Sequence, residues 1–299
     1  MARSRTHARL ADSGSQCIAK ECSIGARWLA YFASQSAANV EDRKLVEQRY
    51  YDRKARLSID PKPSDAREPL GADAMPRLLR APYLEFERRV REVLRPEDVV
   101  LDVGAGTGIH SLLASGDRRQ LIAVDFSLDA LAIARRRAAT HSVPLHVLCG
   151  DGERLPLANA SVDVVTTAGI LYCVDLAALL SEIRRVLRPH GTWILVDSFD
   201  HNPIYRLNRF LGYLRRRRTK RALTNMPNKQ TLARLRREFR RVEVSYHGIF
   251  AFLGPVMRPF IGVRKAERFL NHLDRATPMM QQFAFKIVVT VSRPVAHSE

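Results

Sequence analysis

The sequence has few cysteines, no Cys-x-x-Cys pair and no long apolar run. With four cysteines in 299 residues and no histidines spaced to join them, we expect no metal site and no disulfide framework. No window holds the roughly 18 consecutive apolar residues that a membrane-spanning helix needs. The sequence therefore predicts a cytoplasmic protein with reduced thiols, able to meet a membrane only peripherally, at its surface.

Acidic residues are scarce relative to basic ones. The chain has 31 Asp and Glu against 49 Lys and Arg, a formal charge of +18. Only eight of the basic residues are lysines, a bias that a GC-rich genome would also produce. This excess of positive charge is concentrated in one segment, however. His201–Arg241 has fourteen basic residues and a single acid, Glu238, so its charge is +13 and the other 258 residues together carry only +5.

This basic segment has three interpretations. It attracts an anionic small molecule, it contacts an anionic membrane surface, or it is the solvated face of amphipathic helices. RNA is the less favoured partner, because the segment lacks the interleaved aromatic side chains that stack on single-stranded bases.

The hydrophobic pattern changes at Pro96. Upstream the apolar residues recur at helical spacing, whereas downstream short apolar runs alternate with helical segments, which is typical of a doubly wound α/β sheet with ligands beyond the carboxyl ends of its strands. The predicted strands are Val99–Val103, Leu121–Asp125, Leu145–Leu148, Val162–Thr167, Thr192–Asp197, Val242–Tyr246 and Phe285–Val291. The predicted helices are Ile109–Ser115, Leu128–His141, Leu176–Leu187, one containing Ile204 to Leu214 and one containing Leu232 to Phe239.

A glycine-rich turn follows the first predicted strand. The run from Val100 reads VLDVGAGTG and places glycine at 104, 106 and 108. Glycines permit a tight turn and a close approach of backbone amides to a ligand at the start of a helix. The dinucleotide fingerprint G-x-G-x-x-G would need glycine at position 109, which is Ile109, so NAD and FAD are disfavoured.

Two carboxylates follow the next two strands. Asp125 ends a strand 21 positions after Gly104, where it can accept both ribose hydroxyls of a nucleoside, or it caps the helix that follows. Asp151, beside Gly152, can accept from an adenine amino group or simply form a turn. Phe126 is placed to pack against a purine or to join the core.

Together these residues resemble the class I S-adenosylmethionine-dependent methyltransferases, especially the small-molecule branch with the ubiquinone and menaquinone enzymes. The similar segments are LDVGAGTG from Leu101, the strand ending at Asp125, GDGERLPLANASVDVV from Gly150 and LSEIRRVLRPHGTWILVD from Leu180. The resemblance implies a Rossmann-like fold, mostly parallel with an antiparallel C-terminal hairpin, and S-adenosyl-L-methionine as cofactor. It also implies cofactor contacts from Asp102, Gly104, Ala105, Gly106, Asp125, Phe126, Asp151, Gly152 and Ala168.

The resemblance also divides the chain into segments. We expect residues 1–40 to be a weakly ordered extension and 41–95 a helical cap. Residues 96–200 are the expected cofactor-binding core, and 201–299 a basic lid with the strands that complete the same domain. Within the last segment, the apolar stretch from Ile249 to Pro259 is interpreted either as a pocket or membrane-facing lip for a lipid-like acceptor, or as ordinary core.

The chemistry expected is methyl transfer to oxygen or carbon of a small or lipid-like acceptor, mainly by proximity and alignment. Candidate bases are His201 and Tyr172, which follow predicted strands on the ligand side, although either can be a packed or solvated residue. The segment 168–173 and His190 depart from the family pattern. Alternatives are a non-catalytic nucleotide-site protein that holds RNA or anionic lipid through its basic segment, and an RNA methyltransferase.

Overall fold

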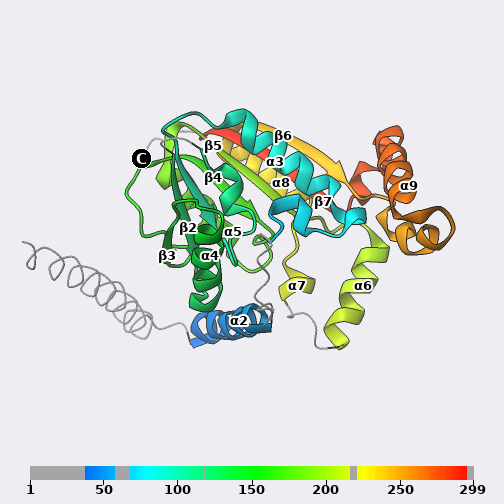
Figure 1. The fold of residues 1–299 in the computed structure, drawn as a ribbon, viewed down its shortest axis with the longest axis horizontal. Helices are drawn as coiled ribbons and strands as arrows, with labels where there is room; N and C mark the ends of the chain where they lie inside the picture. Colours follow the sequence, from blue (N-terminus) through cyan, green and yellow to red (C-terminus); the bar gives the residue numbers. More distant parts are fainter. Residues whose placement is uncertain (1–37, 58–67, 117–118, 216–220, 295–299) are drawn as a thin grey trace, which may run out of the picture. The chain divides into compact units, whose positions relative to one another are not determined.

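The computed structural model describes residues 38–57, 68–116, 119–215 and 221–294 (Figure 1). The chain divides into two compact units, Met1–Tyr50 and Tyr51–Glu299. In the first unit only the beginning of helix α2 (Ala38–Leu57) is described, so the expectation for residues 1–37 lies outside the described part. The second unit contains the end of α2 and all the elements discussed below.

The second unit is built on a seven-stranded sheet in the order β3-β2-β1-β4-β5-β7-β6. Strands β3, β2, β1, β4 and β5 run parallel to one another, whereas β7 lies between β5 and β6 and is antiparallel to both. The predicted doubly wound, mostly parallel sheet with antiparallel C-terminal strands is therefore confirmed. The strands are β1 (Val99–Val103), β2 (Gln120–Asp125), β3 (His146–Cys149), β4 (Val162–Ala168), β5 (Leu187–Ser198), β6 (Phe239–His247) and β7 (Lys286–Pro294).

Helices cover both faces of this sheet. Phe86 and Val90 of α3 pack on one face, and Leu179 and Ile183 of α5 pack on the other around the fully buried Trp193. The helices are α3 (Ala81–Val93), α4 (Leu128–Thr140), α5 (Leu176–Val186), α6 (Pro203–Leu214), α7 (Arg221–Thr224), α8 (Lys229–Glu238) and α9 (Gly254–Ala276). The short 3₁₀ turns are η1 (Gly71–Ala74), η2 (Arg77–Leu79), η3 (Ser111–Ala114), η4 (Ala251–Leu253) and η5 (Pro278–Phe283).

One predicted helix differs from the structure. The predicted helix Ile109–Ser115 is only the 3₁₀ turn η3, because Ser115 returns to extended backbone (φ −59°, ψ 148°) after a single turn. The stretch after Ile249 leads into α9, and Pro255 lies in the first turn of that helix, where its missing N–H costs nothing. The real break in α9 comes at Gly262, whose φ of 76° is left-handed.

One edge of the sheet collects the ligand-side residues. Strands β1 to β5 all end there, and β6 ends there too, because both β5 and β6 run antiparallel to β7. The register pairs Lys286, the first residue of β7, with Ser198 on one side and His247 on the other. Loops from β1, β2, β4, β5 and β6 therefore meet at this carboxyl edge, where open α/β sheets bind ligands.

Candidate functional site

The glycine loop after β1 is tied to the neighbouring strand. The amides of Gly104 and Ala105 both donate to the carbonyl of Val124, at 2.8 and 3.1 Å. Gly104 and Gly106 have φ of 70° and 53°, a region that favours glycine. A Cβ on Gly104 would collide with the side chain of Ile170, whereas one on Gly106 would meet no atom within 4 Å. Gly104 therefore serves packing, and Gly106 borders open space that a ligand can enter.

Asp125 lies directly beside that space, and the residue is only 7% exposed. Its Oδ2 accepts from the amide of Gly106 and its Oδ1 from the amide of Ser127, both at 2.8 Å. Burial raises the pKa of this carboxyl, while the backbone N–H donors oppose the shift. Ser127, not Asp125, caps α4, by accepting from Ala130 N at 3.1 Å. Each Asp125 oxygen keeps a lone pair for a ligand hydroxyl.

The second half of α2 supplies two residues that sequence reasoning missed. The Tyr51 ring meets the Phe126 ring edge-on at 5.9 Å between centroids. The Tyr51 hydroxyl bonds that of Tyr172, and Asp52 accepts from Ser127 Oγ at 2.5 Å. One sequence feature could have indicated these two residues: Tyr50, Tyr51 and Asp52 are consecutive in a helix that is otherwise mainly polar.

The turn after β3 places Asp151 and Gly152 beside the end of β1. Asp151 Oδ1 accepts from Glu153 N at 2.9 Å, so Asp151 also shapes the turn. A Cβ on Gly152 would lie 2.9 Å from Val103 Cγ1, which explains why this position requires glycine. Ala168 ends β4 and precedes Gly169, whose φ is 73° and whose missing Cβ again leaves open space.

Asp102 has a supporting position within β1. Its carboxylate accepts from Ser111 Oγ at 2.5 Å and from Thr166 Oγ1 at 3.2 Å, and the residue is only 4% exposed. Burial raises the pKa of Asp102 to about 6, opposed by the two hydroxyls, while the nearby charge of Asp125 adds to the rise. These contacts fasten β1 to η3 and β4, beneath the glycine loop.

The two candidate bases occupy different surroundings. Tyr172 lies in the loop after β4, where its hydroxyl meets Tyr51 and its carbonyl accepts from Asn225 Nδ2 at 3.0 Å. His201 follows β5, and its Nε2 accepts from the amide of Lys229 at 3.2 Å, at the start of α8. Burial, together with the positive charge of Lys229, lowers the His201 pKa. The structure thus places Tyr172 against Tyr51, which itself contacts Phe126, whereas His201 contacts the first residue of α8.

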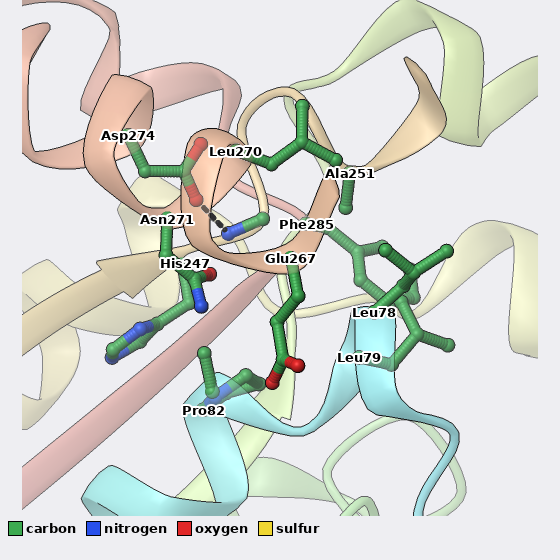
Figure 2. Close-up of a pocket in the computed structure, with 12 residues that line it drawn as sticks. Leu78, Leu79, Pro82, His247, Ala251, Glu267, Leu270, Asn271, Asp274 and Phe285 are labelled. Carbon is green, nitrogen blue, oxygen red and sulfur yellow. Dashed lines mark hydrogen bonds between the residues drawn. The ribbon is translucent and has the colours of Figure 1, made fainter. Parts of the chain in front are cut away.

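A pocket lies further along the same edge, between η2, the start of α3, the end of β6 and α9 (Figure 2). Its lining is mixed. The polar residues are His247, Glu267, Asn271 and Asp274, and the apolar ones are Leu78, Leu79, Ala81, Pro82, Ala251, Leu270 and Phe285. Asp274 accepts from the amides of Gly248 and Phe250, at 2.7 and 3.2 Å, and so closes the turn after β6. Of the apolar stretch 249–259, Ala251 lines this pocket, whereas Val256 is 64% exposed on α9.

The basic segment is partly neutralised and partly exposed. Arg209 is buried and pairs with Asp200, which Arg206 also approaches at 3.6 Å. Around it, α6 exposes several large apolar side chains: Ile204, Leu207, Phe210, Leu211, Tyr213 and Leu214.

None of the described helices is both long and apolar enough to cross a membrane. Across the described ranges, no group of three His, Cys, Asp or Glu side chains is arranged to hold a metal ion.

The central part of the chain matches a known family. Residues 101–195 match the methyltransferase domain. The chain is 37% identical over 97 residues to malonyl-[acyl-carrier protein] O-methyltransferase of Serratia marcescens, covering 32% of this chain and 36% of that protein. It is 36% identical over 115 residues to demethylmenaquinone methyltransferase of Mycolicibacterium vanbaalenii, covering 38% and 48%. The match thus spans less than half the length of either relative.

A solved structure extends the similarity of fold. Geranyl diphosphate C-methyltransferase from Streptomyces coelicolor A3(2) aligns over 81% of this chain and 98% of its own, with a TM-score of 0.54 and 14% identity. At that identity the comparison concerns the fold alone. The family match and the two relatives confirm the resemblance found in the sequence and its cofactor, S-adenosylmethionine. Residues 101–195 are therefore a class I S-adenosylmethionine-dependent methyltransferase domain, one that resembles the quinone methyltransferases.

Proposed function

We propose that the chain as a whole is an S-adenosylmethionine-dependent methyltransferase acting on a small or lipid-like acceptor. The observation that carries this proposal is the open space at Gly106 directly beside the buried carboxylate of Asp125. Such a cradle fits a nucleoside, because the glycine admits the ligand to the backbone while the carboxylate accepts hydroxyl protons.

The proposed cofactor contacts follow from these positions. Asp125 would take the ribose hydroxyls, Asp151 and Gly152 would face the adenine, and Phe126 would pack on it with Tyr51 behind. Gly104, Ala105 and Gly106 would lie along the methionine part, near Ala168 and above the supporting Asp102. When bound, the cofactor supplies an activated methyl group on a sulfonium, so the protein's main task is to align the acceptor with it.

The acceptor side offers one residue for proton handling. We propose Tyr172, because its hydroxyl lies at the carboxyl edge and is held by the hydroxyl of Tyr51. An acceptor that reacts as a protonated oxygen or carbon must lose a proton, and a positioned hydroxyl pair can take part in that transfer. His201 is the weaker candidate, since its Nε2 already accepts from Lys229.

The relatives agree with this acceptor class without naming the acceptor. Their printed names describe methylation of a malonyl-[acyl-carrier protein] and of demethylmenaquinone. A further partner is an anionic membrane surface, proposed for α6. This helix exposes Leu207, Phe210 and Leu214 together with Arg206, and the exposed Arg215 follows it; such amphipathic basic helices bind at lipid interfaces.

Calorimetry with S-adenosylhomocysteine tests the cofactor site. We expect the unaltered chain to bind, and Asp125→Ala to bind at least about tenfold more weakly because a charge-assisted hydrogen bond is lost. Asp129→Ala is the matched control, since Asp129 is a partly exposed carboxylate on the adjoining helix that pairs with Arg56. Absence of binding by the unaltered chain, or equal affinity in Asp125→Ala, would contradict the proposal.

A labelled methyl donor tests the activity itself. The chain is incubated with metabolite and lipid extracts, and the labelled product is identified. We expect label in a small or lipid-like molecule, and about a tenfold or greater loss of rate in Tyr172→Phe if its hydroxyl takes part in proton transfer. Label found only in RNA would favour the RNA methyltransferase alternative, and no transfer despite cofactor binding would favour a binding protein.

A further inference from the structure

Lys286, the first residue of β7, is a lysine that is almost completely covered by other residues. It is 8% exposed and lies at the carboxyl edge, between Ser198 and His247 in the sheet register. Its Nζ lies 5.1 Å from the centroid of the Tyr83 ring and 5.7 Å from that of Phe285. Aromatic rings attract a cation but supply no hydrogen-bond acceptor of the ordinary kind.

The ammonium has no ionic or hydrogen-bonding partner in the part of the chain that the structure describes. The nearby buried acid is Asp197, whose pKa is raised by burial, while the charge of Lys286 opposes that rise. Yet no ion pair joins them, because the Asp197 oxygens accept instead from the amides of Leu171 and Ser198, at 2.8 and 2.7 Å. The three donors of this ammonium are therefore available to an acceptor that the described residues do not supply.

Two neutral histidines flank this lysine. His110 follows the glycine loop and stacks on Tyr83, with 5.2 Å between ring centroids and 2° between planes. His110 Nδ1 and His247 Nε2 are both buried and, within the described residues, without a hydrogen-bond partner. Burial lowers the pKa of each imidazole to about 4, so both are neutral at pH 7. A neutral imidazole can donate one hydrogen bond to a ligand and adds no competing charge.

The cluster lies between the two sites already described. His110 comes two residues after Gly108, and Asp197 holds the loop that leads to Tyr172. On the other side, His247 and Phe285 also line the pocket of Figure 2. Whatever binds at Lys286 is therefore close both to the glycine loop and to the pocket of Figure 2.

We propose that Lys286, flanked by His110 and His247, is the receptor for an oxyanion on the acceptor, a carboxylate or a phosphate. This inference rests on the proposed methyltransferase function and specifies its acceptor side. It places the recognition of negative charge inside the site, on a residue outside the basic segment His201–Arg241.

The test uses matched six-carbon probes on the full chain saturated with S-adenosylhomocysteine. Hexanoate, hexyl phosphate and the neutral hexanamide share an alkyl chain and differ in charge. We expect at least one of the two anions to bind about tenfold or more tightly than the amide, and the tighter anion identifies the oxyanion. Lys286→Met should lower anion binding to the level of the amide, while Lys265→Met, which removes an exposed lysine on α9, should retain the preference.

Three measurements keep the outcome decisive. Equal binding of anions and amide by the unaltered chain, or an undiminished preference in Lys286→Met, overturns the proposal. If Lys286→Met does not fold, acetylation of the unaltered chain replaces it, and hexanoate or hexyl phosphate must slow acetylation at Lys286 but not at Lys265. Failure of the unaltered chain to bind S-adenosylhomocysteine contradicts the methyltransferase function instead, so the two failures are distinguishable.

Discussion

Replacing Asp102 by asparagine should stabilise the protein at neutral pH. The Asp102 carboxyl is buried, with a pKa raised to about 6 from an ordinary value of 3.8. A raised pKa in the folded state means that this carboxyl favours folding most when protonated. That contribution is fully present below pH 3.8 and is lost as the pH rises through 6. At pH 7.5 the ionised side chain therefore costs about 3 kcal/mol, at 1.36 kcal/mol per pKa unit.

Asparagine has nearly the same shape and carries no charge at any of these pH values. We expect Asp102→Asn to raise the free energy of unfolding by up to about 3 kcal/mol at pH 7.5, and by about 1.5 kcal/mol at pH 5. The gain is an upper value, because the hydroxyls of Ser111 and Thr166 lose a charged acceptor.

Urea unfolding of both proteins at pH 5, 6, 7 and 8 measures this difference. Asp73→Asn is the control, since its side chain is 76% exposed and its loss should change stability by no more than about 0.5 kcal/mol. The reasoning is refuted if Asp102→Asn is no more stable than the unaltered chain at pH 7.5. It is equally refuted if the gap between the two proteins does not narrow towards pH 5.

Three further substitutions test the roles of two glycines in the loop after β1 and of the ion pair between Arg209 and Asp200. Gly106→Ala should cost only about 1 kcal/mol of backbone strain, because its Cβ meets nothing, but should weaken S-adenosylhomocysteine binding about tenfold or more in calorimetry. Gly104→Ala should instead lower the free energy of unfolding by about 1–3 kcal/mol in urea, since its Cβ collides with Ile170; unchanged stability would contradict this packing role. Arg209→Met should lower thermal stability by an amount equivalent to about 1–3 kcal/mol, because the buried Arg209 no longer pairs with Asp200 while Arg206 stays near it, and a neutral effect would show that the pair contributes little.

Local patterns predicted most of the sheet. The predicted strand Val99–Val103 has the bounds of β1, and Leu128–His141 differs from α4 by one residue. These elements have strong periodicity and clear ends, such as the Ser127 cap. The helix predicted at Ile109–Ser115 failed because its apolar residues suit a single 3₁₀ turn as well as an α-helix, and only the backbone path into β2 distinguishes the two.

The sequence by itself determined the glycine spacing at 104, 106 and 108, the carboxylate at the end of the second strand and the family resemblance. All of these are short-range patterns that can be recognised without knowledge of the fold. Tertiary structure alone decided which residues join them. Tyr51 meets Tyr172 across 121 positions, and Lys286 lies beside His247 and Tyr83 only because β7 inserts between β5 and β6. Such contacts depend on strand order and burial, which a single sequence does not encode in any local pattern.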